Sequence, residues 1–200
     1  MHRAADVESY APAQKFLHWT TAALVLALLI SGWTLTSGLL SPGQALDSFF
    51  GVHKSMGIVV LILTLWRLSV RAAHPAPALP ATLRPWEIAV VGLVHGLLYV
   101  LLILQPLSGW MVYTLSTHKS LFFGLFRIPD LPFAADLGIT AGQLPFLEEL
   151  HGTLAGILAV TVLLHIGAAF KHHFVVRDDV LLRMSPARLV PFLQALRAKR

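Results

Sequence analysis

The sequence HGTLAGILAVTVLLHIGAAFKHHF, residues 151–174, decides the fold of this chain. No charged residue lies between His151 and His165, and most positions are Leu, Ile, Val, Ala or Gly. An apolar run of this length predicts a helix that crosses a membrane. The two histidines are 14 residues apart, so on a helix they lie about 21 Å apart along the axis and within about 40° of one face. Two imidazoles on one face, one near each membrane surface, indicate two stacked metal centres.

The composition of the chain is that of an integral membrane protein. Hydrophobic residues make up 56% and charged residues 12% of its 200 residues, whereas a soluble domain carries about 25% charged residues. Cysteine is absent, which excludes disulfides, thiolate-bound iron–sulfur clusters and haem attached through C-x-x-C-H. The 10 histidines are therefore the nitrogen ligands present in quantity. Asp6 and Glu8 precede the first apolar run, and we expect a mature cytoplasmic N-terminus rather than a removable signal peptide.

Three more apolar segments accompany the one at 151–174. Together they predict an all-α integral membrane protein, a bundle of four transmembrane helices in one membrane domain that covers residues 1–200. We expect helices at about 16–37, 50–70, 86–113 and 149–174, an outer interfacial link at 114–148 and a basic tail at 175–200. The link is rich in phenylalanine and proline, and we expect it to form short helices at the membrane surface.

The distribution of basic residues predicts the orientation. With four helices, both termini and the link between the second and third segments lie on one side of the membrane. That side holds 12 of the 15 lysines and arginines, and the other side holds Lys54, Lys119 and Arg127. The positive-inside rule therefore predicts cytoplasmic termini. Topology and contact with anionic membrane lipid explain the net charge of +5, so we do not expect nucleic acid as a partner.

The histidines of the apolar segments fall into two levels. His18 and His165 lie near the cytoplasmic surface, and His53 and His151 lie near the outer surface. Two imidazoles from different helices at one level are what a six-coordinate, low-spin haem b requires, and a filled coordination sphere favours electron transfer over ligand binding. His95 lies at about the cytoplasmic level. It competes with His18 as a ligand, although a supporting or packing role is favoured.

Other polar residues near these levels have candidate roles. Arg67 and Lys15 at the cytoplasmic level, and Lys54 at the outer level, are candidate partners for haem propionates, although an ordinary interfacial role explains each of them as well. His172 follows His165 by 7 residues and shares its helix face. It is either a solvated surface residue, as is His173, or the edge of a quinone pocket below the cytoplasmic haem.

These features resemble the bacterial cytochrome b561 family of small four-helix dihaem membrane proteins. The resemblance covers most of the chain, and its motifs come in the order and with the spacing of the family. They are QKFLHW at 14–19, VHKSMG at 52–57 followed by LWRLSVR, LVHGLLYVLLILQPLSGW at 93–110, FFGLFRIPDL at 122–131, the stretch from EELHG to KHHF at 148–174, and DDVLLRM at 178–184.

The resemblance implies two haem b groups in a protein of the bacterial inner membrane. His53 and His151 would hold one haem at the periplasmic level, and His18 and His165 would hold the other at the cytoplasmic level. Some members are similar to a superoxide:ubiquinone oxidoreductase, which takes an electron from superoxide outside and passes it to ubiquinone in the membrane. The outer segments hold 3 basic and 5 acidic residues, so only their local arrangement could steer an anionic donor.

Two other functions stay open on the sequence alone. A membrane-anchor cytochrome b subunit would collect electrons from a partner dehydrogenase, with the phenylalanine-rich link as the docking surface for that redox partner. A transporter or structural bundle would use its histidines for hydrogen bonds between helices and would carry no chromophore.

Overall fold

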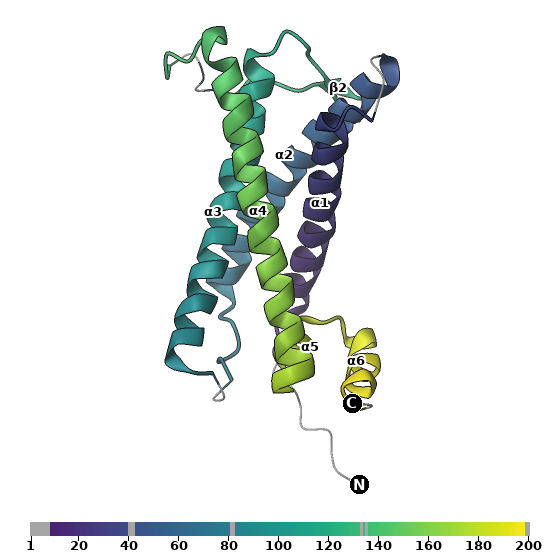
Figure 1. Ribbon diagram of the computed structural model, residues 1–200, viewed down its shortest axis with the longest axis vertical. Helices are drawn as coiled ribbons and strands as arrows, with labels where there is room; N and C mark the ends of the chain where they lie inside the picture. Colours follow the sequence, from purple (N-terminus) through teal and green to yellow (C-terminus); the bar gives the residue numbers. More distant parts are fainter. Residues whose placement is uncertain (1–8, 40–42, 81–82, 133, 135, 199–200) are drawn as a thin grey trace.

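The computed structural model describes residues 9–39, 43–80, 83–132, 134 and 136–198. An elongated bundle of long helices dominates it (Figure 1): α1 (Pro12–Thr36), α2 (Gln44–Ala73), α3 (Pro85–Leu115) and α4 (Leu144–Lys171). Each of these four helices is long and apolar enough to cross a membrane. Helices of this kind satisfy most of their backbone hydrogen bonds internally, as lipid requires. The protein is therefore an all-α integral membrane protein with a bundle of four transmembrane helices.

Each helix begins one to six residues before the apolar run from which it was predicted. Pro12 and Pro85 open α1 and α3 at positions where a missing N–H group leaves no hydrogen bond unmade. The side chains of Gln14 and Glu87 then accept a free backbone N–H at the start of these helices, each at 3.0 Å. Such first turns are polar, so hydropathy alone does not reveal them.

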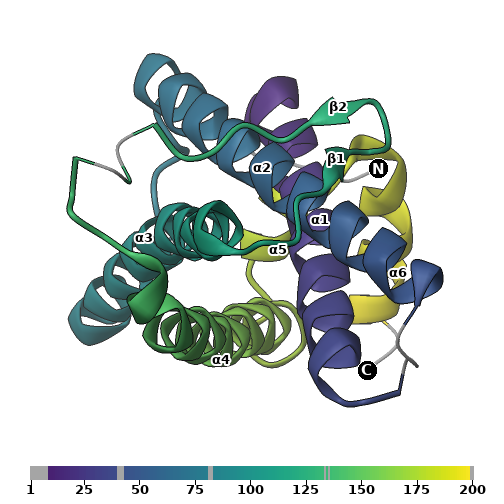
Figure 2. The same cartoon turned by 90° about the horizontal axis from the view of Figure 1, so that it is seen from above.

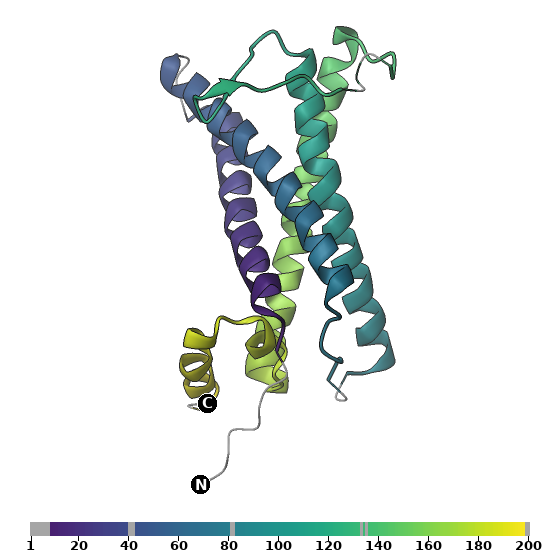
Figure 3. The same cartoon turned by 180° about the vertical axis from the view of Figure 1, so that it is seen from behind.

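The helices pack in chain order, α1 against α2, α2 against α3 and α3 against α4. Figure 2 shows the four helices from the end of the bundle, and Figure 3 shows α2 running diagonally across it. Large apolar side chains such as Ile30, Leu93 and Leu163 are exposed on the outer surface of the bundle. Such faces suit helices surrounded by lipid rather than water.

An apolar layer closes the bundle at mid-height. Buried side chains from all four helices form it: Val25, Val60, Leu101, Leu102 and Leu158. Leu158 lies 7 residues, or about 10.5 Å along the helix, from both His151 and His165. The layer therefore separates the two ends of the bundle at which the predicted histidine levels lie.

The link between α3 and α4 forms a short antiparallel hairpin of β1 (Leu121–Phe122) and β2 (Phe126–Arg127), followed by the 3-10 turn η1 (Ala141–Gln143). Our expectation of short helices in this link was therefore wrong for most of its described residues. Phe123 and Gly124 adopt positive φ angles of 45° and 79°, which a tight hairpin turn requires. The N–H of Phe123 donates to the Ser55 hydroxyl of α2 at 2.9 Å, which ties the hairpin to the bundle. We call this end of the bundle the hairpin end.

The opposite end, which we call the tail end, carries the start of α1 and the segment after α4 (Figure 1). There α4 continues into a π-helical turn, η2 (His172–Val176), and the chain ends in α5 (Val180–Met184), η3 (Ala187–Leu189) and α6 (Val190–Ala198). The indole N–H of Trp19 in α1 donates to the carbonyl of Met184 at 2.9 Å. The tail is thereby folded back against the first helix.

Candidate functional site

The histidines predicted for the outer level lie opposite each other at the hairpin end. The ring centroids of His53 in α2 and His151 in α4 are 6.4 Å apart, and the ring planes are inclined at 81°. Both rings line a cavity of about 490 Å³ to which all four helices contribute residues. Its walls are mainly apolar, as expected for a site that holds a large flat cofactor.

A serine hydroxyl holds each of these two imidazoles. Ser31 Oγ lies 2.8 Å from His53 Nδ1, and Ser108 Oγ lies 2.9 Å from His151 Nδ1. Each hydroxyl donates its one proton to the backbone carbonyl three residues earlier in its own helix. A hydroxyl that donates there accepts a hydrogen bond from the imidazole when that ring carries its proton on Nδ1. This tautomer leaves the Nε2 lone pair of both rings available to a metal.

Glycines give these rings their space. A Cβ atom on Gly109 would lie only 2.8 Å from Cε1 of His151, and one on Gly32 would lie 3.4 Å from Cε1 of His53. The amide nitrogen of Gln105 lies 3.3 Å from His151 Nε2, and its buried Oε1 has no hydrogen-bond partner among the described residues. The Gln105 amide would have to turn aside when a metal takes that Nε2 lone pair.

The residues that support these two imidazoles form a repeated tripeptide that sequence reasoning missed. Ser-Gly-Trp occurs at 31–33 in α1 and again at 108–110 in α3. In both copies the serine bonds a histidine of the following helix, and the glycine leaves room for that ring. The repetition was visible in the sequence. It passed unnoticed because small residues are common in membrane helices.

Three imidazoles meet at the tail end. The ring centroids of His18 and His165 are 6.1 Å apart with planes inclined at 66°, and that of His95 is 5.2 Å from His165. His95 Nδ1 lies 2.8 Å from the carbonyl oxygen of Val91, to which it donates. The Nδ1 atom of His18 is buried and has no hydrogen-bond partner in the described part of the chain.

The ring separations distinguish pairs that fit around one metal from a pair that does not. A metal–imidazole bond is about 2.0–2.1 Å long, so two imidazoles on opposite sides of one metal have ring centroids about 6.3 Å apart. The separations of 6.4 Å at the hairpin end and 6.1 Å at the tail end agree with this value. The 5.2 Å between His95 and His165 is too short for two imidazoles on opposite sides of one metal. The residues present therefore fit a bis-histidine haem at each end.

One arginine accompanies the tail-end imidazoles. Arg67 of α2 lies close enough to His18, His95 and His165 to interact with each electrostatically. Its guanidinium stands 5.4 Å from the ring centroid of Tyr99. Among the described residues no carboxylate forms an ion pair with it. A partly buried cation of this kind is suited to an acidic group of a bound ligand.

The cations of the hairpin end are not equivalent. Lys119 and Arg127 both pair with Asp130, at 2.7 Å and 3.8 Å. Lys54 lines the cavity, and its Nζ donates to the hydroxyl of Ser120 at 3.1 Å. No described carboxylate lies within ion-pair distance of it. The charge on Lys54 is therefore the one that faces the cavity without a direct counterion.

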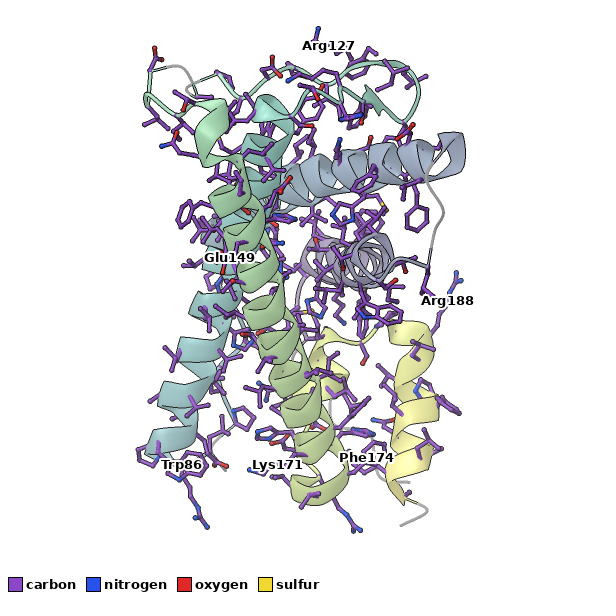
Figure 4. All side chains as sticks on the ribbon, turned by 45° about the horizontal axis from the view of Figure 1, so that its top comes forward. Trp86, Arg127, Glu149, Lys171, Phe174 and Arg188 are labelled. Carbon is purple, nitrogen blue, oxygen red and sulfur yellow. The ribbon has the colours of Figure 1, made fainter. Side chains whose placement is uncertain are left out.

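A second cavity, of about 340 Å³, lies at the tail end between the beginning of α3 and the end of α4. Trp86 and Lys171, labelled together in Figure 4, line it with Glu87 and His172. His172 Nδ1 lies 2.6 Å from the carboxylate of Asp178, and the two side chains are only 10% and 8% exposed. A buried imidazole paired with a carboxylate beside a polar cavity can hold and move a proton.

The interpretation of His172 and His173 as solvated surface residues was wrong. His173 is fully buried, and its Nε2 lies 3.1 Å from the carbonyl oxygen of Leu193 in α6. Both rings are buried because α4 ends in the π-helical turn and the tail then covers that turn.

Comparison with known proteins agrees with this arrangement. The family model described as Prokaryotic cytochrome b561 matches residues 9–187. The chain is 28% identical over 185 residues to the probable superoxide oxidase CybB of Yersinia pestis, with 90% of this chain and 98% of that protein covered. It is 29% identical over 182 residues to cytochrome b561 homolog 2 of Escherichia coli (88% and 91% covered) and 29% identical over 183 residues to cytochrome b562 of Cereibacter sphaeroides (90% and 96% covered). The chain belongs to the prokaryotic cytochrome b561 family and is a membrane b-type cytochrome of electron transfer.

Proposed function

We propose that this protein binds two haem b groups and carries electrons across the bacterial inner membrane, from an outside donor to membrane ubiquinone. The observation that carries the proposal is the pair of opposed imidazoles at each end of the bundle, with centroids 6.4 Å and 6.1 Å apart. When bound, haem b would supply a one-electron redox centre at each level, and the two α4 histidines that would hold these groups lie about 21 Å apart along the helix. His53 and His151 hold the group at the hairpin end, and His18 and His165 hold the group at the tail end.

The supporting side chains act on orientation and charge. The hydroxyls of Ser31 and Ser108 keep the hairpin-end imidazoles in the tautomer that offers Nε2. Arg67 pairs with a propionate at the tail end, which explains a partly buried guanidinium without a described carboxylate partner. At the hairpin end we assign the charge of Lys54 to attraction of the donor rather than to a propionate.

Superoxide is the donor that the hairpin end favours. The basic residues concentrated at the tail end support an orientation with that end in the cytoplasm and the hairpin end outside. Lys54 then presents a positive charge at the outer cavity, where it attracts a small anion. Each superoxide loses one electron there and leaves as dioxygen. The similarity to a probable superoxide oxidase supports this choice of donor.

Ubiquinone accepts the electrons at the tail-end cavity. Reduction to ubiquinol takes two electrons and two protons, so two superoxide ions reduce one quinone while two protons are taken up. His172 borders the cavity, and its Nδ1 lies 2.6 Å from the carboxylate of Asp178, so the two groups are placed to pass a proton between them. His172 therefore supplies a proton to the quinone and is reprotonated from the cytoplasm.

A second candidate function is that of an anchor cytochrome for a partner dehydrogenase. The observation in its favour is the exposed apolar tip of the hairpin, where Phe123, Leu125 and Phe126 are 45%, 77% and 55% exposed. Exposed apolar patches at a membrane surface serve either a protein partner or lipid.

The test begins with the purified protein in detergent. A reduced-minus-oxidised spectrum with haem quantified per chain should give two low-spin b-type haems, and His53→Ala should leave one. Superoxide generated by a pulse should reduce the haems, and a water-soluble ubiquinone analogue should reoxidise them. Well-folded protein without haem would overturn the electron-transfer proposal. Two haems that are not reduced by superoxide but accept electrons from a co-purifying dehydrogenase would favour the anchor function.

A further inference from the structure

His95 is the one imidazole of the tail-end cluster that the proposed haem ligation leaves without a role. Its ring centroid is 5.2 Å from that of His165, and the two planes are nearly perpendicular at 83°. This separation is about 1 Å too short for two ligands on opposite faces of one metal. The two rings form no hydrogen bond with each other in this structure, but their separation is close to the roughly 5 Å between centroids that a bond between two imidazole nitrogens about 3 Å apart would give.

The protonation of His95 is set by its own helix. Nδ1 lies 2.8 Å from the carbonyl oxygen of Val91, and a carbonyl accepts hydrogen bonds only. Neutral His95 therefore carries its proton on Nδ1 and has a free lone pair on Nε2. Its Nε2 is therefore an acceptor on a ring that is bonded to its own helix and lies beside His165.

His165 needs an acceptor of this kind. Neither of its ring nitrogens has a hydrogen-bond partner among the residues that the structure describes. A metal bound to Nε2 leaves the proton on Nδ1, and that N–H group requires a partner in the apolar interior. At the hairpin end the hydroxyls of Ser31 and Ser108 meet the same need for His53 and His151.

We infer that His95 is a positioning residue for the tail-end haem: its free Nε2 accepts the hydrogen bond from Nδ1–H of His165 and fixes the rotation of that ligand. The inference rests on the proposed ligation of a haem by His18 and His165. An imidazole is a stronger acceptor than a hydroxyl, so it makes the ligand more basic and favours ferric over ferrous iron. The tail-end haem therefore has a lower midpoint potential than it would have without His95.

The test is His95→Phe, which keeps a flat ring but removes the acceptor, compared with His95→Gln, which restores an acceptor through its amide oxygen. Both proteins are purified in detergent, their haem is quantified per chain, and each haem is titrated potentiometrically. We expect His95→Phe to keep two low-spin haems. The ferrous-to-ferric ratio of one haem should rise about tenfold at a given potential, a shift of 59 mV for one electron, while the other haem is unchanged. His95→Gln should have a midpoint potential close to that of the wild-type protein.

The other outcomes overturn the inference in distinguishable ways. Loss of one haem from both variants would make His95 an axial ligand in place of His18. Two haems with unaltered midpoint potentials in His95→Phe would show that His95 is only a packing residue. Wild-type protein that binds no haem at all would instead refute the proposed function on which this inference rests. Ser108→Ala, which removes an acceptor at the other end, should shift the potential of the other haem only.

Discussion

Alanine at Gly109 offers the sharpest test of the hairpin-end site. The new Cβ atom would lie 2.8 Å from Cε1 of His151, a distance that carbon atoms in proteins do not adopt. Comfortable contact between two carbon atoms begins at about 3.5–4.0 Å, so the ring or the helix must move by roughly 0.7–1.2 Å. The neighbouring residue, Ser108, holds the same ring by a 2.9 Å hydrogen bond, so the displacement strains that bond as well.

The consequence for haem can be estimated from the same displacement. A metal–imidazole bond is about 2.0–2.1 Å long, and a shift of this size is roughly a third to somewhat more than half of that length. Loss of a contact that orients a metal ligand costs about 10–100-fold in affinity, or about 1.4–2.7 kcal/mol. We therefore expect Gly109→Ala to release the hairpin-end haem or to convert it to a high-spin form, while the tail-end haem stays low-spin.

Gly32 provides the matched control, because it occupies the same place in the other Ser-Gly-Trp tripeptide. A Cβ atom there would lie 3.4 Å from Cε1 of His53, which a movement of a few tenths of an ångström relieves. The assay is haem per chain and the reduced-minus-oxidised spectrum of both variants after mild detergent extraction. Gly109→Ala protein with two low-spin haems and unaltered potentials would show that His151 is not held where we propose.

Three further predictions concern the charged and titratable side chains. Lys54→Gln should slow haem reduction by superoxide about 2–10-fold and weaken the dependence of that rate on ionic strength, while reduction by a neutral quinol is unaffected. Equal slowing with both donors would contradict the steering role. Arg67→Leu should lower the ferrous-to-ferric ratio of the tail-end haem about tenfold at a given potential, because a positive charge beside the haem favours the reduced form, and Arg67→Lys should lower it less; a potentiometric titration decides this. His172→Leu should keep two haems but slow reoxidation by a ubiquinone analogue at least about tenfold, and Asp178→Asn should slow it less; unchanged reoxidation in both would remove the pair from the proton route.

The four helices and the pairing of histidines were open to prediction because both follow from local rules. A membrane helix needs about 20 apolar residues, and each of the four runs has them. Histidines 14 residues apart on one helix must reach both ends of one face, so His151 and His165 identified both levels. The structure brings His53 and His18 to those levels from other helices.

Other features could not be predicted because they depend on distant residues or on very short elements. The strands of the hairpin have two residues each, too few for a periodic pattern. The burial of His173 depends on a carbonyl 20 residues later in α6, and only the folded tail brings that group near. The count of three basic and five acidic residues at the outer side did not show whether an anionic donor would be attracted there. The structure adds the pairing: Asp130 binds Lys119 and Arg127, and Lys54 has no described ion-pair partner.

The apolar layer between the two levels bears on how protons and electrons move in the proposed reaction. The layer is built from valine and leucine side chains and offers no group that can carry a proton. The nearby hydroxyls of Thr64 and Thr161 donate to carbonyls of their own helices, at 2.7 Å each, and so form no relay across it. Electrons can cross such a layer by tunnelling, whereas protons need a chain of polar groups or water. Protons for the quinone must then enter at the tail end through His172, and each electron that crosses moves a full negative charge inward. Turnover in the proposed direction would therefore be opposed by a membrane potential that is negative inside, by up to about 2.3 kcal/mol per electron at 100 mV.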